Sequence, residues 1–376
     1  MVQRRRERPR RALTFVKLAA ATVAVLAVLA VAFPVRFIGV HCYARRNQPI
    51  ARSLELRRAT TDVRGYFREE APTFLALPEW YIVYSTQEYA RFLESRPPSQ
   101  FPYLDAIRQY WSYYADVCRA TKGVYRYDTG VHLMLGVIGT SFSAENAVRG
   151  AYERTVGRFT ELIAGYHTEE DAFARRTAGE YGAFMHTAPW YEFPFASALT
   201  ALWRETPLLG KGLVRKWERR LALTAEYGIK AVYGWMIARS TGAVYAAEEL
   251  VIHAWVEDAP DRIFDDDRVR RVRTVGPGSY LVMLPRYEPF TEVVALLVKQ
   301  GVRFRDFAGN ETIVLTAIAP RAWDYRFPSG EVVLSATILT NPAAKRIAVK
   351  APVASLHVIL AGLERSGVIL EHLYDY

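Results

Sequence analysis

Glu249 and His253 form the clearest pair in the sequence that could carry out acid–base chemistry. They are four residues apart in Glu248–Val256, whose pattern predicts a short helix, so the two side chains would share one helix face. A carboxylate beside an imidazole orients a general base or supplies two ligands to a metal ion. A metal site needs a third ligand, which the sequence does not identify, and an ordinary hydrogen bond along the helix is the alternative interpretation.

The other histidines and the acidic clusters are weaker candidates. His167 lies three residues before Glu170, and His186 has no nearby partner in the sequence. The acidic run at 265–267 lacks the alternating order of a calcium loop and is followed by arginines, so a solvated linker explains it better. The sequence contains no nucleophile elbow, zinc-protease motif, phosphate-binding loop or haem-attachment motif. It therefore predicts no cofactor and no metal, and none of its segments resembles a family of known activity.

Cys42 and Cys118 are the only cysteines, and two cysteines in 376 residues exclude a fold built on disulfides. In an oxidising compartment the two residues could form a bridge. Alternatively, Cys118 lies on the apolar stripe of a predicted helix and would be a buried free thiol.

Aromatic residues are unusually abundant, with 23 Tyr, 18 Phe and 8 Trp, and they gather at residues 80–84, 110–114 and 190–195. Core packing is the simplest explanation, because each ring buries a large area. Neighbouring prolines suggest surface loops around the first and third groups, where the rings would face lipid headgroups or line a pocket for a lipid, quinone or other apolar molecule. The candidate binding residues from these two groups are Trp80, Tyr81, Trp190 and Tyr191.

Leu13–Phe33 is the longest apolar run in the chain, and the arginine-rich residues 1–12 precede it. As a helix this run would be about 32 Å long, close to the roughly 30 Å hydrocarbon layer of a bilayer. We therefore predict a transmembrane anchor at 13–35. The alternative is a cleaved signal peptide with Ala30-Val31-Ala32 as its cleavage site, although the apolar stretch is longer than such a peptide needs.

The positive charge of the chain is concentrated beside this apolar run. Residues 1–35 carry a net charge of +6, so only +4 of the chain's +10 belongs to residues 36–376. This distribution is typical of a membrane-orientation signal and does not provide the basic face that nucleic-acid binding requires. The positive-inside rule predicts a single-pass protein of the bacterial inner membrane, with residues 1–12 in the cytoplasm and the bulk of the chain in the periplasm.

The central part of the chain, 36–275, is predicted to be an aromatic-rich helical domain. Apolar residues recur at helical spacing, and prolines and glycines delimit the helices. The predicted helices cover residues 102–122, 130–163, 169–187 and 211–240. Within the second, Val131–Phe142 is apolar on every side, which predicts a central helix shielded by its neighbours or, alternatively, a re-entrant segment in the membrane.

Residues 257–276 form a mixed-charge segment that leads into Gly276-Pro277-Gly278, where we place a domain boundary. The residues that follow, 277–376, alternate between strand-like and helix-like patterns. Their order, β-α-β-β, extra strands and then α-β, matches a ferredoxin-like α+β domain. The match concerns topology only and implies no activity.

The function that the sequence favours is a non-enzymatic interaction or scaffolding role for a membrane-anchored envelope protein, because no catalytic constellation is visible. Its partners would be the lipid bilayer, through the N-terminal helix, and other envelope proteins or a second copy of the chain. A periplasmic binder of a lipid, quinone or other apolar small molecule is the first alternative. An enzyme that uses Glu249 and His253 as acid–base or metal-binding groups is the second.

Overall fold

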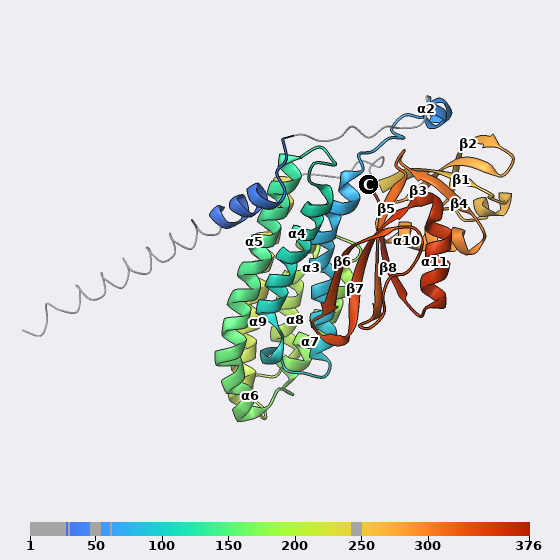
Figure 1. The fold of residues 1–376 in the computed structure, drawn as a ribbon. Helices are drawn as coiled ribbons and strands as arrows, with labels where there is room; N and C mark the ends of the chain where they lie inside the picture. Colours follow the sequence, from blue (N-terminus) through green and yellow to red (C-terminus); the bar gives the residue numbers. More distant parts are fainter. Residues whose placement is uncertain (1–27, 29–30, 46–53, 61, 242–249) are drawn as a thin grey trace, which may run out of the picture.

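The computed structural model describes residue 28 and residues 31–45, 54–60, 62–241 and 250–376. A helical domain that ends at Thr241 precedes two four-stranded antiparallel sheets (Figure 1). The predicted anchor at 13–35 lies mostly outside the described residues. Among the helices that the structure does describe, none has the length and apolar character needed to cross a membrane.

The helices of the first domain largely follow the sequence-based predictions. Their bounds are α2, Leu54–Thr60; α3, Ala71–Leu93; α4, Tyr103–Thr121; α5, Thr129–Tyr152; α6, Arg158–Ala164; α7, Glu169–Phe184; α8, Phe195–Glu205; and α9, Leu213–Thr241. The helix predicted at 102–122 is α4, and the one predicted at 130–163 is α5 and α6, joined by a π-helical turn at Glu153–Gly157. The other two predicted helices are α7 and α9.

The part of the helical domain next to the sheets has a core rich in tyrosine, which we call the aromatic core. Its most deeply buried rings from α3 and α4 are Phe74, Tyr81, Tyr103, Tyr110, Tyr113 and Tyr114. Their hydroxyl groups find partners inside the protein, since Tyr81 donates to the carbonyl of Ala106 at 3.0 Å and Tyr110 to that of Leu135 at 2.8 Å. Buried hydroxyls that keep a hydrogen bond avoid most of the cost of leaving water.

The opposite part of the helical domain, where α6, α7 and α9 meet, has a buried ionic core. Its four cations all come from α9, and its carboxylates come from the π-helical turn and from α6, α7 and α9: Arg215, Lys216, Arg219 and Arg220 with Glu153, Glu161, Glu170, Asp171 and Glu218. Arg215 lies 2.8 Å from Asp171, and Arg219 lies 2.6 Å from Glu153. Charges this deeply buried are tolerated because each is paired.

The two sheets have the same topology. The strands are β1, Val251–Glu257; β2, Arg270–Gly276; β3, Ser279–Pro285; β4, Arg303–Phe307; β5, Thr312–Pro320; β6, Glu331–Ile338; β7, Asn341–Pro352; and β8, Ile369–Tyr374. The first sheet has the order β2-β3-β1-β4 and the second β6-β7-β5-β8, and each has a helix before its last strand: α10, Glu288–Lys299, and α11, Leu356–Arg365. The region is thus two β-β-β-α-β units in succession.

The second sheet joins the two halves of the molecule. Along β5, Ile313 and Leu315 face the core shared by both sheets, α10 and α11, whereas Val314 faces the aromatic core. This alternation follows the two-residue period of a strand. The last strand also closes onto the first long helix, because the hydroxyl of Thr73 on α3 donates to the carbonyl of Tyr374 on β8 at 2.7 Å.

Two expectations for this region need correction. The helix predicted at 248–256 is instead the strand β1, which pairs with β3 on one side and β4 on the other. A short apolar run of β-branched and aromatic residues suits a central strand, and periodicity alone does not distinguish it from a buried helix. The order of elements predicted for 277–376 is present, but the strands divide between two sheets. The boundary placed at 276–278 falls between β2 and β3, which pair with each other.

Candidate functional site

The predicted acid–base pair of Glu249 and His253 lacks the helix that would bring it together. Glu249 lies outside the described residues, and His253 is on the strand β1. The His253 ring lies 5.4 Å from the ring of Tyr66, and burial lowers the pKa of its imidazole. The structure therefore gives His253 an aromatic neighbour in place of a carboxylate.

A different histidine–carboxylate pair is present, where α3 and α10 meet the strand β8. His372 Nδ1 faces Glu288 Oε2 at 3.3 Å and the hydroxyl of Thr291 at 3.2 Å. The indole of Trp80 stacks on the His372 ring at a centroid distance of 3.8 Å, and the His186 ring lies 5.9 Å from the same indole. We call these five residues the histidine cluster.

The histidine cluster has the electrostatics of a potential proton-transfer site. Burial opposes the ionisation of Glu288, but contact with His372 and the nearby His186 outweigh it, and the net effect lowers the pKa of Glu288. Burial lowers the pKa of His186, whose Nε2 is buried without a hydrogen-bond partner. An imidazole held between a carboxylate and a hydroxyl can accept or pass a proton. One face of the His372 ring is nevertheless covered by Trp80.

No feature of the sequence could have assembled this cluster. Trp80 comes from α3, Glu288 and Thr291 from α10, and His372 from β8, while His186 follows the end of α7. Their spacing along the chain has no helical or strand period, because only the tertiary fold brings these elements together. Of the five residues, the sequence singles out Trp80 as a binding candidate and His186 as a weak one.

The surface-loop interpretation of the aromatic groups is wrong for Trp80 and Tyr81. Both lie within α3, which continues through Pro78, and Tyr81 is buried. A proline inside a helix removes one hydrogen bond but does not always end the helix. Trp190 and Tyr191 belong to a short 3₁₀ turn, where the Trp190 ring packs 5.3 Å from Tyr233 of α9.

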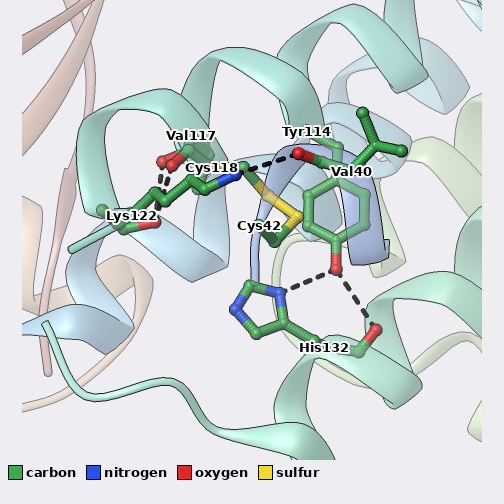
Figure 2. The surroundings of a disulfide bond; sticks show 8 residues. Val40, Cys42, Tyr114, Val117, Cys118, Lys122 and His132 are labelled. Carbon is green, nitrogen blue, oxygen red and sulfur yellow. Dashed lines mark hydrogen bonds between the residues drawn. A yellow bond between two sulfur atoms is a disulfide. The ribbon is translucent and has the colours of Figure 1, made fainter. Parts of the chain in front are cut away.

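The two cysteines form a disulfide (Figure 2). It joins Cys42, which directly follows a helical segment at residues 31–41, to Cys118 near the end of α4, and both residues are buried. His132 of α5 lies beside the bridge, with the Tyr114 hydroxyl 2.9 Å from its Nδ1, and burial lowers the pKa of His132. The sulfur atoms and one imidazole nitrogen lie within 4.8 Å of one another, but sulfurs that are bonded to each other are not metal ligands.

The helical segment 31–41 also packs closely on the helical domain. Phe33 and Phe37 lie 4.8 and 4.9 Å from the ring of Trp111 on α4. Ile38 and Pro34 rest against Gly136 of α5, where a Cβ atom would come within 3.1 and 3.3 Å of them. These distances are tighter than ordinary van der Waals contact, so a larger residue at 136 would have to push the side chains of Ile38 and Pro34 away.

α5 is not the shielded central helix that Val131–Phe142 predicts. Leu133, Met134 and Val137 are exposed, while His132 and Leu135 face the core. Its apolar surface therefore points out of the domain over much of its length.

α9 is reversed relative to an ordinary amphipathic helix of a soluble domain. The cations of the ionic core point inward, and every exposed residue from Leu213 to Met236 is apolar or aromatic. A soluble helix normally places its charges outward and its apolar stripe on the core.

Comparisons with known protein families, with curated proteins and with solved structures found no match to this chain.

Proposed function

We propose that this chain is a membrane-anchored envelope protein with a non-enzymatic interaction or scaffolding role. Residues 13–35 would be the anchor in a bacterial inner membrane, with 1–12 in the cytoplasm and the bulk of the chain in the periplasm. The Cys42–Cys118 disulfide supports this location, because such bridges form and persist in oxidising compartments.

The observation that carries the proposal is the close attachment of segment 31–41 to the helical domain. This segment contains the last five residues of the predicted anchor, 31–35, and the six that follow. Aromatic packing on Trp111, contact with Gly136 and the disulfide all hold it in place. Lys122 adds a hydrogen bond to the carbonyl of Val40 at 2.9 Å. A protein that presents a surface to membrane partners benefits from a fixed orientation relative to the bilayer.

The small-molecule alternative receives less support from the geometry. The cavity beside the disulfide, which Thr121, Tyr127 and His132 help to line, has a volume of about 10 Å³. That is room for about one water molecule, and drug-sized ligands need several hundred Å³. The candidate residue Tyr81 is part of the aromatic core.

The histidine cluster supports an enzyme as the second candidate. Its His372–Glu288 pair supplies the acid–base chemistry that the sequence assigns to Glu249 and His253. Glu288→Gln tests the role, because it keeps the shape of the side chain and removes its charge. For an interaction protein we expect this substitution to leave assembly unchanged.

The location is tested with reporter fusions and with the redox state of the cysteines. A phosphatase fused after Tyr376 should be active, and one fused after Arg11 should be inactive. In the full chain, a maleimide should not label Cys42 or Cys118 before a reducing agent is added, and should label both afterwards. An active fusion after Arg11, or thiols that react without reduction, would contradict the proposed orientation.

The interaction role is tested by native mass spectrometry of the detergent-extracted full chain. We expect a defined homo- or hetero-oligomer without a bound small molecule. Gly136→Leu on α5 should reduce the oligomeric fraction, because the larger side chain displaces segment 31–41. Gly39→Ala, a substitution within segment 31–41 whose added Cβ meets no atom within 4 Å, is the control. A monomer that retains a stoichiometric small molecule would favour the binding alternative, and a bound metal would favour the enzyme.

A further inference from the structure

The outer face of α9 is apolar from Leu213 to Met236. Leu221 and Ile229 in its middle are 58% and 68% exposed, and Trp217 and Trp235 lie near its two ends. From Leu213 to Met236 the face extends about 35 Å at the rise of an α-helix. A soluble monomer rarely leaves an apolar surface of this extent in water.

The inner face of α9 shows why its apolar side cannot turn inward. Arg215, Lys216, Arg219 and Arg220 are buried in the ionic core, and each is bound to carboxylates of neighbouring elements. Rotating the helix would break these pairs, and an unpaired buried charge costs several kcal/mol. The outward orientation of the apolar face is therefore fixed by the charges behind it.

α5 lies beside α9 and exposes a second apolar face. Val137 is 54% and Val148 is 72% exposed. Lys230 of α9 lies 2.8 Å from Glu145 of α5, and this carboxylate is the one charged group exposed on α5 between Leu133 and Ala151. Pairing with Lys230 neutralises that charge, so the surface of the two helices is close to uncharged.

The predicted anchor determines what lies nearest to these faces. Segment 31–41, which begins with the last residues of that anchor, rests on Gly136 of α5, one residue before the exposed Val137. The helical domain therefore begins within a few residues of the point where the chain would leave the bilayer. Trp217, Tyr233 and Trp235 add the ring types that favour the headgroup layer.

We propose that the outer faces of α5 and α9 lie on the outer leaflet of the same bilayer, with their apolar side chains in contact with lipid. This inference rests on the proposed membrane anchoring. α9 would lie along the membrane surface, as interfacial helices do, with the ionic core on its aqueous side. The disulfide and the packing of Phe33 and Phe37 on Trp111 would hold the bundle in this orientation.

The test uses nitroxide labels on the full chain in vesicles of phosphatidylethanolamine and phosphatidylglycerol. Ile229→Cys and Leu221→Cys place labels on the α9 face, and Ile369→Cys places a control label at a position on β8 that is 65% exposed. The native cysteines are in the disulfide and do not react without reduction. Oxygen, which concentrates in lipid, should relax the α9 labels more than a water-soluble nickel chelate does, and the control label should show the reverse order.

Each other outcome overturns the inference in a recognisable way. An α9 label that nickel relaxes as strongly as the control label faces water. If the α9 labels are shielded from both relaxing agents and the spins of different molecules lie close together, a second copy of the chain covers the α9 face. Extraction of the vesicles with alkaline carbonate separates a failure of this inference from a failure of the proposed function. A chain that carbonate releases has no membrane anchor, so the proposed function fails. A chain that stays in the membrane but has water-exposed α9 labels refutes only the lipid contact.

Discussion

The aromatic core and the ionic core belong to one helical domain but solve the same problem in different ways. Each buries polar atoms between long helices. In the aromatic core the atoms are neutral hydroxyls, such as that of Tyr110, which donates to a carbonyl at 2.8 Å. In the ionic core they are full charges, such as Arg215, which is bound to Asp171 and Glu218.

The difference teaches which interior tolerates change. A tyrosine that loses its hydroxyl leaves a phenylalanine of nearly the same shape, so packing persists. An arginine that is lost leaves carboxylates without a counter-charge, and their desolvation is no longer offset. Several ionic-core atoms already lack hydrogen bonds, namely Glu153 Oε2, Glu161 Oε1, Arg219 Nε, and Nε and Nη1 of Arg220. We therefore expect the ionic core to be the more fragile of the two.

Arg215→Ala should have the largest effect. Arg215 is fully buried and contacts Asp171, Glu218 and Thr160. Its removal should lower the free energy of unfolding by about 3–5 kcal/mol, because it leaves uncompensated buried carboxylates. Urea unfolding followed by circular dichroism measures the change, and a loss below about 1 kcal/mol would show that water or rearrangement replaces the pair.

Asp306 shows what burial alone does to a carboxylate, because its hydrogen-bond donors are neutral groups and not cations. This buried carboxylate accepts hydrogen bonds from the Tyr66 hydroxyl and the Gly309 amide, and burial raises its pKa to about 6. Between its ordinary pKa of 3.8 and about pH 6, the folded state therefore binds a proton at Asp306 that the unfolded chain does not bind. The contribution of Asp306 to stability should rise by about 2 kcal/mol as the pH falls from 7 to 4.

Asp306→Asn is the matched variant for this pH dependence. It keeps an acceptor for Tyr66 and Gly309 and does not titrate, so the difference in stability between the two proteins isolates the carboxyl group. Unfolding curves measured between pH 4 and pH 7 should diverge toward the higher pH, with the variant the more stable protein there. Parallel curves would mean that Asp306 ionises at its ordinary pKa.

Tyr110→Phe should have a smaller effect in the aromatic core. It removes the hydrogen bond to the carbonyl of Leu135 and keeps the ring in place. We expect a loss of about 1 kcal/mol, the usual contribution of a neutral hydrogen bond. Thermal unfolding monitored by tyrosine and tryptophan fluorescence tests this value. If the loss equals that of Arg215→Ala, the proposed contrast between the two cores fails.

Arg176→Ala should have the smallest effect of the four. Arg176 pairs with Glu205 between α7 and α8, but about half of each side chain is exposed. Exposed pairs contribute about 0–1 kcal/mol, because water and salt screen them. This variant is also the control for Arg215→Ala, since both remove an arginine from an ion pair of the same domain. A loss as large as that of Arg215→Ala would show that burial does not decide the cost.

The helices were predictable because their periodicity reflects burial. The stripe that includes Tyr103, Tyr110, Tyr114 and Cys118 predicts α4, and these residues are buried in the structure. The helix at 211–240 was predictable from its pattern, but its orientation was not. Periodicity shows that charged and apolar residues occupy opposite faces, and only the partners on α6 and α7 decide which face is inside.

The β-region and the candidate site depended more on tertiary contacts. The strand β1 resembles a short helix in sequence, since a short and mostly apolar segment fits either structure. The division of the strands between two sheets is set by long-range pairing, which a single sequence does not reveal. The disulfide remained one of two alternatives, because the distance between Cys42 and Cys118 follows from the packing of segment 31–41 on α4.

The contact between α3 and β8 has a consequence for the order in which the chain can fold. Thr73 emerges from the ribosome about three hundred residues before its partner Tyr374, whose separation from it is 301 positions. The part of α3 that faces β8 therefore stays uncovered until residues 369–374 have been made, whereas α4 and α7 can cover its other faces earlier. Contacts between such distant residues form slowly and leave aggregation-prone intermediates. A chain that stops before β8 would therefore leave the surface of α3 around Thr73 without its partner strand.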